Sequence, residues 1–164
     1  MNTHLAVAVH ILVAVESLSR KGNGPVPTEA ISWSAKTHKV FILRIVNKLE
    51  SFGLVKTIRG PHGGIELTKK GKKSTLKDVY LATQEDINVY KIHETNEKCG
   101  IGNNIIDVLN DVQNDLDSKL LDEMSKISIT DLTIKTLELA DEKVANGINY
   151  TNYKEDLYEE KLVN

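Results

Sequence analysis

Basic and histidine side chains gather at two places in the first half of the chain, residues 37–48 and residues 59–64. The five histidines show no H-E-x-x-H spacing, and no serine, histidine and aspartate occur at the spacing of a known hydrolase motif. Residues 60–64 are rich in glycine but lack the Gly-Lys-Ser/Thr ending of a phosphate-binding loop. We therefore expect no enzyme, and we interpret both places as surfaces that contact a polyanion.

The net charge is divided unequally along the chain. Of the 21 basic and 23 acidic residues, 12 and 4 lie within residues 1–73, a net charge of +8, and the other 9 and 19 give the remainder −10. This asymmetry indicates that the first half faces a polyanion. A merely solvated basic surface is the alternative, and the hairpin pattern described next is what favours DNA.

The elements that would position these residues follow the order helix, helix, helix, hairpin. Residues 3–19 are apolar nearly all round, as in a buried helix, and a short second helix, for which Thr28 is the predicted N-cap, runs to about Ala35. Residues 37–52 carry apolar side chains at the i, i+3, i+4, i+7 spacing of one helical face. Residues 54–59 and 65–68 have strand composition on either side of a glycine-rich turn.

This order predicts a winged helix-turn-helix domain over residues 1–82, in a fold that is mainly α with a small β-hairpin. In such domains the helix after the turn enters the major groove, and the hairpin lies along the backbone or the minor groove. The partner would be double-stranded operator DNA of palindromic sequence. The predicted DNA-contacting residues lie at helix starts, on the basic helix and at the wing: Thr28, Thr37, His38, Lys39, Arg44, Lys48, Arg59, His62, Gly63 and Gly64.

The second half reads as a short helix, a loop and two longer helices. Thr75 and Asp78 have the spacing of a capping box, which predicts a helix ending near Ala82, with a loop at residues 83–102 after it. Residues 103–146 are predicted as dimerisation helices, the last of them capped by Thr130 or Asp131. Residues 147–164 form a tail for which the pattern indicates no structure.

The helix from Asn103 carries one apolar stripe in an otherwise polar sequence of about twenty residues. Packing on the chain's own winged domain is one explanation of this stripe. A homodimer seam is preferred because the stripe is long and palindromic operators call for two-fold symmetry. The predicted interface residues are Ile105, Leu109, Val112, Leu116 and Leu120.

Cys99 is the single cysteine of the chain, so no internal disulfide can form and a reducing, cytoplasmic setting is expected. A thiolate just before a helix is favoured by the helix dipole, which makes Cys99 a candidate redox sensor. Its products would be a bridge between subunits, a mixed disulfide with a low-molecular-weight thiol, or a sulfenic acid. A small buried hydrophobe is the alternative reading.

The composition is that of a folded, soluble protein, with 40% apolar and 27% charged residues. The longest apolar stretch, residues 5–15, is interrupted by His10 and is shorter than the roughly 20 residues that span a bilayer. It also lacks the basic leader and cleavage site of a secretory signal. We expect no membrane partner and no cofactor.

Residues 39–49, 53–55 and 59–67, in this order, resemble the Rrf2 family of bacterial winged-helix regulators. Residues 75–79 and 129–132 resemble its short linker helix and the motif after its dimerisation helix. The likeness covers roughly residues 3–140. It implies a homodimer formed through the helix at 103–125, operator recognition by residues 37–48 plus the wing, and repression.

The chain departs from this family at two places. Leu43 precedes Arg44 where the family often has two arginines, so operator preference is not carried over. Members that hold an iron-sulfur cluster use three cysteines, which excludes such a site here, and His93 and Asp107 beside Cys99 would be poor substitutes. Residues 99–102 nevertheless resemble the Cys-x-x-Gly element of thiol-sensing relatives.

Two other functions stay open from sequence. The winged domain could dock a protein and touch no DNA, in which case binding would respond little to salt. A small ligand in the loop at residues 83–102 could replace thiol sensing. The favoured function is a sequence-specific DNA-binding repressor released by oxidation at Cys99.

Overall fold

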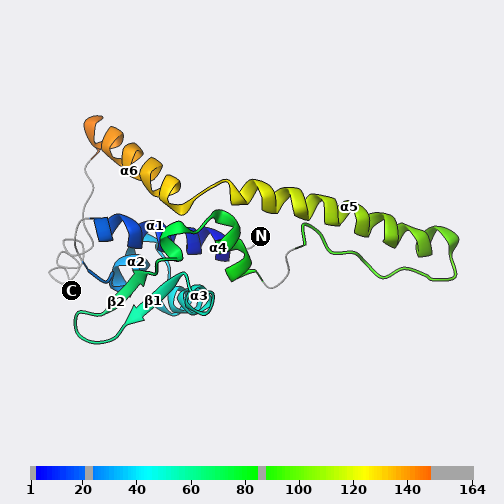
Figure 1. Cartoon of the computed structure of the whole chain (residues 1–164), viewed down its shortest axis with the longest axis horizontal. Helices are drawn as coiled ribbons and strands as arrows, with labels where there is room; N and C mark the ends of the chain where they lie inside the picture. Colours follow the sequence, from blue (N-terminus) through cyan, green and yellow to red (C-terminus); the bar gives the residue numbers. More distant parts are fainter. Residues whose placement is uncertain (1–2, 21–23, 85–87, 149–164) are drawn as a thin grey trace.

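The computed structural model describes residues 3–20, 24–84 and 88–148, so the predicted tail lies outside the described residues from 149 onward. Figure 1 shows a head of helices and one hairpin, from which a long helix projects. In chain order the elements are α1 (His4–Arg20), α2 (Thr28–Ser34), α3 (Lys39–Ser51), β1 (Val55–Ile58), β2 (Gly64–Leu67), the 3-10 turn η1 (Gly71–Lys73), α4 (Leu76–Thr83), α5 (Gly100–Ser125) and α6 (Ile129–Ala145). The predicted fold class, mainly helical with a small hairpin, is confirmed.

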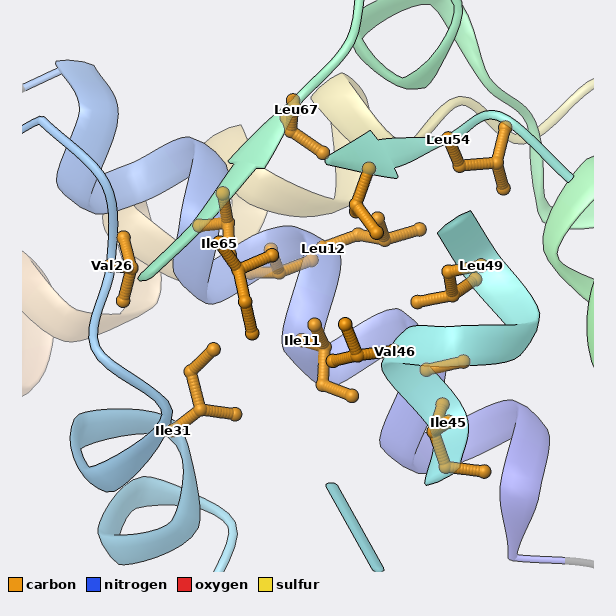
Figure 2. Packing of buried hydrophobic residues seen from close by; sticks show 14 of the residues in the cluster. Ile11, Leu12, Val26, Ile31, Ile45, Val46, Leu49, Leu54, Ile65 and Leu67 are labelled. Carbon is orange, nitrogen blue, oxygen red and sulfur yellow. The ribbon is translucent and has the colours of Figure 1, made fainter. Parts of the chain in front are cut away.

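Helix α1 is apolar on nearly every side because it is covered by α3, α4, α6 and β2. Its side chains Ile11 and Leu12 are buried. Val46 and Leu49 of α3 and Ile65 of the hairpin are buried with them, and none of the five is more than 1% exposed. Figure 2 shows these side chains converging from the three elements into one cluster. Each buried aliphatic side chain of this size contributes about 1.5–3 kcal/mol of transfer free energy. The cluster therefore fixes one face of α3 inward and leaves its opposite face outside the core.

The turn between α2 and α3 is set by its backbone. Lys36 takes a left-handed conformation with φ of 46°, and the N–H of Thr37 donates to the carbonyl of Ser32 at 3.1 Å. Thr28 was predicted as the cap of α2, but it is the first helical residue and Pro27 occupies the cap position. This fits proline well, because its restricted φ suits the start of a helix and its missing N–H is not needed there.

The wing is an antiparallel hairpin in which Val55 pairs with Leu67 and Ile58 with Gly64. A third extended stretch joins it, because Val26 and Ile65 exchange backbone hydrogen bonds of 2.9 and 2.8 Å. This bridge holds the loop before α2 against the wing. The helix-turn-helix and the hairpin consequently form one packed unit.

Helix α4 starts as the sequence predicts. The hydroxyl of Thr75 accepts from the N–H of Asp78, and the carboxylate of Asp78 accepts from the N–H of Thr75 at 2.8 Å. This reciprocal capping box satisfies two N–H groups that the first turn leaves without partners. The helix ends at Thr83, one position beyond the predicted end.

The predicted caps of α6, Thr130 and Asp131, are wrong. Ser128 caps this helix, and its hydroxyl accepts from the N–H of Asp131 at 3.0 Å. The cap lies earlier in the chain than predicted. Ser128 also forms an isolated β-bridge with Thr75, which joins the start of α6 to the start of α4. Such a pairing between distant segments leaves no local signal in the sequence.

A buried carboxylate fastens α6 to α1. The side chain of Glu16 is 11% exposed and accepts hydrogen bonds from Arg20, from Thr130 at 3.0 Å and from Thr133 at 2.9 Å. A buried charge is tolerated only when it is hydrogen-bonded in this way. The two threonine donors therefore hold α6 against α1, whereas Arg20 pairs with Glu16 within α1.

Helix α5 begins at Gly100, earlier than the predicted Asn103. The segment before it, residues 88–99, runs back along the helix (Figure 1). The N–H of Val89 donates to the carboxylate of Asp117 at 2.8 Å, and the hydroxyl of Tyr90 donates to the carbonyl of Leu109 at 2.7 Å. This segment therefore covers one side of α5.

The structure divides the stripe that the sequence predicts as a dimer seam into exposed and half-buried residues. Ile105, Val112 and Leu116 remain exposed, whereas Leu109 and Leu120 are half-buried.

None of the helices within residues 3–20, 24–84 and 88–148 is long and apolar enough to cross a bilayer.

Candidate nucleic-acid interface

The outward face of α3 carries the central candidates. Ile42, Ile45 and Val46 point into the core, so the helical repeat turns Lys39 and Arg44 to the exposed side. His38 caps the helix without a side-chain hydrogen bond and is also exposed. The start of α3 is His38 and Lys39 rather than the predicted Thr37, which is half-buried in the turn.

Lys39 already has a partner in the free protein. Its ammonium group donates to the carboxylate of Glu29 on α2, and this hydrogen bond lowers the pKa of Glu29 below its ordinary value. Both side chains are about half exposed, at 52% and 54%, so the pair contributes little to stability. Lys39 can therefore exchange Glu29 for a phosphate at small cost, and the pair also links α2 to the start of α3.

Lys48 and Thr28 are less exposed to solvent than Lys39 and Arg44. The ammonium group of Lys48 donates to the carbonyl of Thr83 at the end of α4, 3.3 Å away. Thr28 is half-buried at the start of α2. A DNA contact by Lys48 would require this side chain to leave α4, and its role stays a prediction.

The wing contains two exposed side chains and two glycines that its backbone geometry requires. Arg59 and His62 are exposed at the tip. A Cβ on Gly63 would overlap the carbonyl oxygen of Ile58, and a Cβ on Gly64 would overlap the carbonyl oxygen of Val26. Both glycines are thus required by the turn and by the bridge to the loop before α2, whether or not DNA approaches them.

The sequence reasoning missed two apolar residues on the outward face of α3. Val40 is 73% exposed and Leu43 is 37% exposed, beside Arg44. The signal was present, because both lie off the buried 42, 45, 46, 49 pattern. Apolar side chains on a major-groove helix contact the 5-methyl group of thymine, whereas arginine binds the edge of guanine. The face can therefore read both kinds of base.

Cys99 lies at the end of α5 that is remote from the head (Figure 1). It is the N-cap residue and is exposed, so the alternative of a buried hydrophobe is wrong. Hydrogen bonds from the backbone N–H groups of Gly102 and Ile101 lower the pKa of the thiol below its ordinary value. These hydrogen bonds favour the thiolate, which is the nucleophilic form of cysteine.

A head of this form, with an exposed basic helix after the turn and a hairpin beside it, defines the winged-helix DNA-binding regulators. The sequence profile of Rrf2, described as an iron-dependent transcriptional regulator, matches residues 1–135. The chain belongs to the Rrf2 family of bacterial DNA-binding transcriptional regulators.

One named relative and two solved structures illustrate the likeness. The transcriptional regulator CymR of Bacillus subtilis is 27% identical over 117 residues, which cover 70% of this chain and 83% of CymR. The solved structure of B. subtilis CymR, the global cysteine regulator, matches with a TM-score of 0.60 at 18% identity and covers 82% of this chain and 96% of that chain. A crystal structure from Lactobacillus plantarum matches with a TM-score of 0.66 at 19% identity, over 88% of this chain and 99% of that one. At such identities the two structures show the shared fold.

The residues present do not fit the iron-sulfur cluster of cluster-holding members. The chain has one cysteine, whereas such clusters are held by several thiolates. Within residues 3–20, 24–84 and 88–148, no three histidine, cysteine, aspartate or glutamate side chains gather as a metal site, so His93 and Asp107 do not complete one with Cys99.

Proposed function

We propose that the chain is a homodimeric repressor that binds palindromic operator DNA with α3 and the wing of each protomer. The observation that carries this proposal is the outward face of α3, where Lys39, Val40, Leu43 and Arg44 lie together on a head that has a net charge of +8 over residues 1–73. A positive face on a major-groove helix is what phosphate attraction and base recognition both require. Such a regulator works in the cytoplasm, with residues 1–82 as its DNA-binding domain.

The dimer forms through α5. Five apolar side chains of α5 are 37–81% exposed: Ile101, Ile105, Val108, Val112 and Leu116. A contiguous apolar surface of this kind is unusual on a monomer and marks an interaction site. Pairing with the same stripe of a second copy would remove this surface from water and place two heads symmetrically. Two recognition helices would then reach successive major grooves, roughly 34 Å apart.

The experiment selects duplexes from a random DNA pool with the purified protein and measures their binding by fluorescence anisotropy. Arg44→Ala is expected to weaken binding by about 1–3 kcal/mol, or roughly 5- to 150-fold. Lys135→Ala is the matched control, because it removes an exposed basic residue of α6 and should leave binding unchanged. Equal binding by Arg44→Ala and the wild type would remove α3 from the interface.

Salt distinguishes this function from a protein-docking adaptor. Each phosphate neutralised lowers log K by about 0.9 for each unit of log salt concentration, so operator binding should fall steeply between low and physiological salt. An apolar docking surface would respond little. A chain that retains no duplex at low ionic strength would favour the adaptor.

The proposed release signal is oxidation at Cys99. The Cys99 thiolate attacks one sulfur of a disulfide donor, forms a mixed disulfide and expels the donor's other half as a thiolate. The added group at the N-terminus of α5 changes how the paired helices cross and misaligns the two heads. Cys99→Ser should keep operator binding but lose release by the disulfide donor. Unchanged release would assign the signal to another site, such as a small ligand bound to residues 88–99.

A further inference from the structure

A cleft of about 320 Å³ opens between α1, α2 and α6, away from the exposed face of α3 and from Cys99. Its walls come from all three helices, with His10 and Ser17 from α1, Ile31, Trp33 and Ser34 from α2, and Thr136 from α6. The volume lies at the small end of the roughly 300–1,000 Å³ that hold ligands. The cleft therefore suits a molecule of one or two rings.

The side chains that line the cleft favour an uncharged ligand. None of the described residues that line it is a lysine, arginine, aspartate or glutamate, so a charged ligand would lose its hydration without gaining a counter-charge. Burial also lowers the pKa of His10 below its ordinary value, which favours the neutral form of its ring. His10 Nε2 and Ser34 Oγ lie 2.9 Å apart and form a polar pair in the cleft, which the hydroxyls of Ser17 and Thr136 also line.

An aromatic face completes the cleft. Trp33 lines it and is 39% exposed, and the remaining wall is mainly aliphatic. An indole ring of this kind gains most from a second aromatic ring stacked or packed edge to face against it. We propose that the cleft between α1, α2 and α6 binds a small, uncharged aromatic molecule that carries one hydrogen-bonding group.

The position of the cleft connects it to the recognition helix. Helix α2 forms one wall, and on the same helix Glu29 is paired with Lys39, the first residue of α3. A ligand that shifts α2 against α1 would alter this pair and the angle at which α3 is presented. This consequence depends on the proposed operator binding, whereas ligand binding itself can be measured without DNA.

The test uses the full chain and 1-aminonaphthalene, an uncharged two-ring amine that absorbs where tryptophan emits. Trp33 is the only tryptophan of the chain, so energy transfer from it reports probe bound near this cleft, and the variants below localise it. Saturable transfer is expected in the wild type. Ala14→Phe fills the cleft from α1 and should weaken binding at least about tenfold, and Ala6→Phe, at an exposed position of the same helix, should leave it unchanged.

A second pair of variants keeps the test valid where Ala14→Phe fails to fold. Thr136→Phe fills the cleft from an exposed position of α6, and Lys135→Phe is its neighbour outside the cleft. Equal binding by the filling and control variants would overturn the proposal, because the probe would then be held elsewhere. Trp33 emission that changes with protein concentration and not with the probe would also overturn it, since a second copy of the chain would be the occupant. Operator binding by the unliganded protein separately tests the proposed function.

Discussion

Replacing thymine by uracil at single positions of a selected operator removes one methyl group from the major groove and keeps every hydrogen-bonding edge. The outward face of α3 makes this change informative. Val40 is 73% exposed and Leu43 is 37% exposed, and neither is one of the buried side chains of α3. We predict that each contacts a thymine methyl group in the half-site.

The magnitude follows from the surface that the contact buries. One methyl-sized group removed from water is worth about 0.8 kcal/mol, so each contacted thymine should contribute about fourfold to Kd. Val40→Ala should weaken the unmodified operator by a similar factor, because it withdraws the side chain from the same methyl group. The two losses should not add, since either change alone removes the contact.

The assay is a double-mutant cycle by fluorescence anisotropy, with uracil placed in turn at each thymine of one half-site. For Val40→Ala the uracil penalty should vanish at one position and persist at the others. Val144→Ala, which shortens a 53% exposed valine on α6, is the matched control and should keep every penalty. Full additivity of Val40→Ala and uracil at every position would refute thymine recognition by this residue.

Three further predictions concern the seam, the sensor and the anchor of α6. Val112→Asp places a charge in the exposed stripe of α5 and should convert the dimer to a monomer in sedimentation experiments, whereas Asp111→Asn beside it should not. Because hydrogen bonds lower the pKa of Cys99, alkylation by iodoacetamide should reach its full rate at lower pH than for a free cysteine peptide, and a matching profile would contradict the lowered pKa. Glu16→Ala removes the carboxylate that accepts hydrogen bonds from Thr130 and Thr133 of α6 and should reduce the free energy of unfolding by about 2 kcal/mol in urea, whereas exposed Glu138→Ala should change it little.

Local patterns in the sequence predicted the local elements well. The apolar repeat on α3 and the capping box at Thr75 and Asp78 each depend on residues within a few positions of one another, and both are present. The same holds for the hairpin, whose glycine-rich turn separates two short apolar segments. The Rrf2 motifs that gave the resemblance are drawn from these same stretches.

Pairing between distant segments was beyond such patterns. The bridge between Val26 and Ile65 leaves no room for a Cβ at Gly64. The bridge between Thr75 and Ser128 lies at the start of α6, where Ser128 is the cap. Likewise, the hydroxyl of Tyr90 donates to the backbone carbonyl of Leu109, which places the segment before α5 against that helix. These features depend on which surfaces meet in three dimensions.

The DNA-contacting set was only partly recoverable for a related reason. Lys39 and Arg44 were predicted because basic residues signal phosphate contact, and both are exposed. Val40 and Leu43 were passed over because apolar residues are ordinarily assigned to a core, although both lie off the apolar repeat that the sequence already shows on α3.

The central claim is that α5 holds two recognition helices rigidly at a fixed spacing. Its most direct test is a spacing series, in which base pairs are inserted between the two half-sites of the selected operator and binding is measured with the stoichiometry. We predict two protomers on each duplex, and a loss of most affinity when about five base pairs turn one half-site to the opposite face of the helix. Equal affinity at every spacing, or one protomer on each duplex, would contradict the claim.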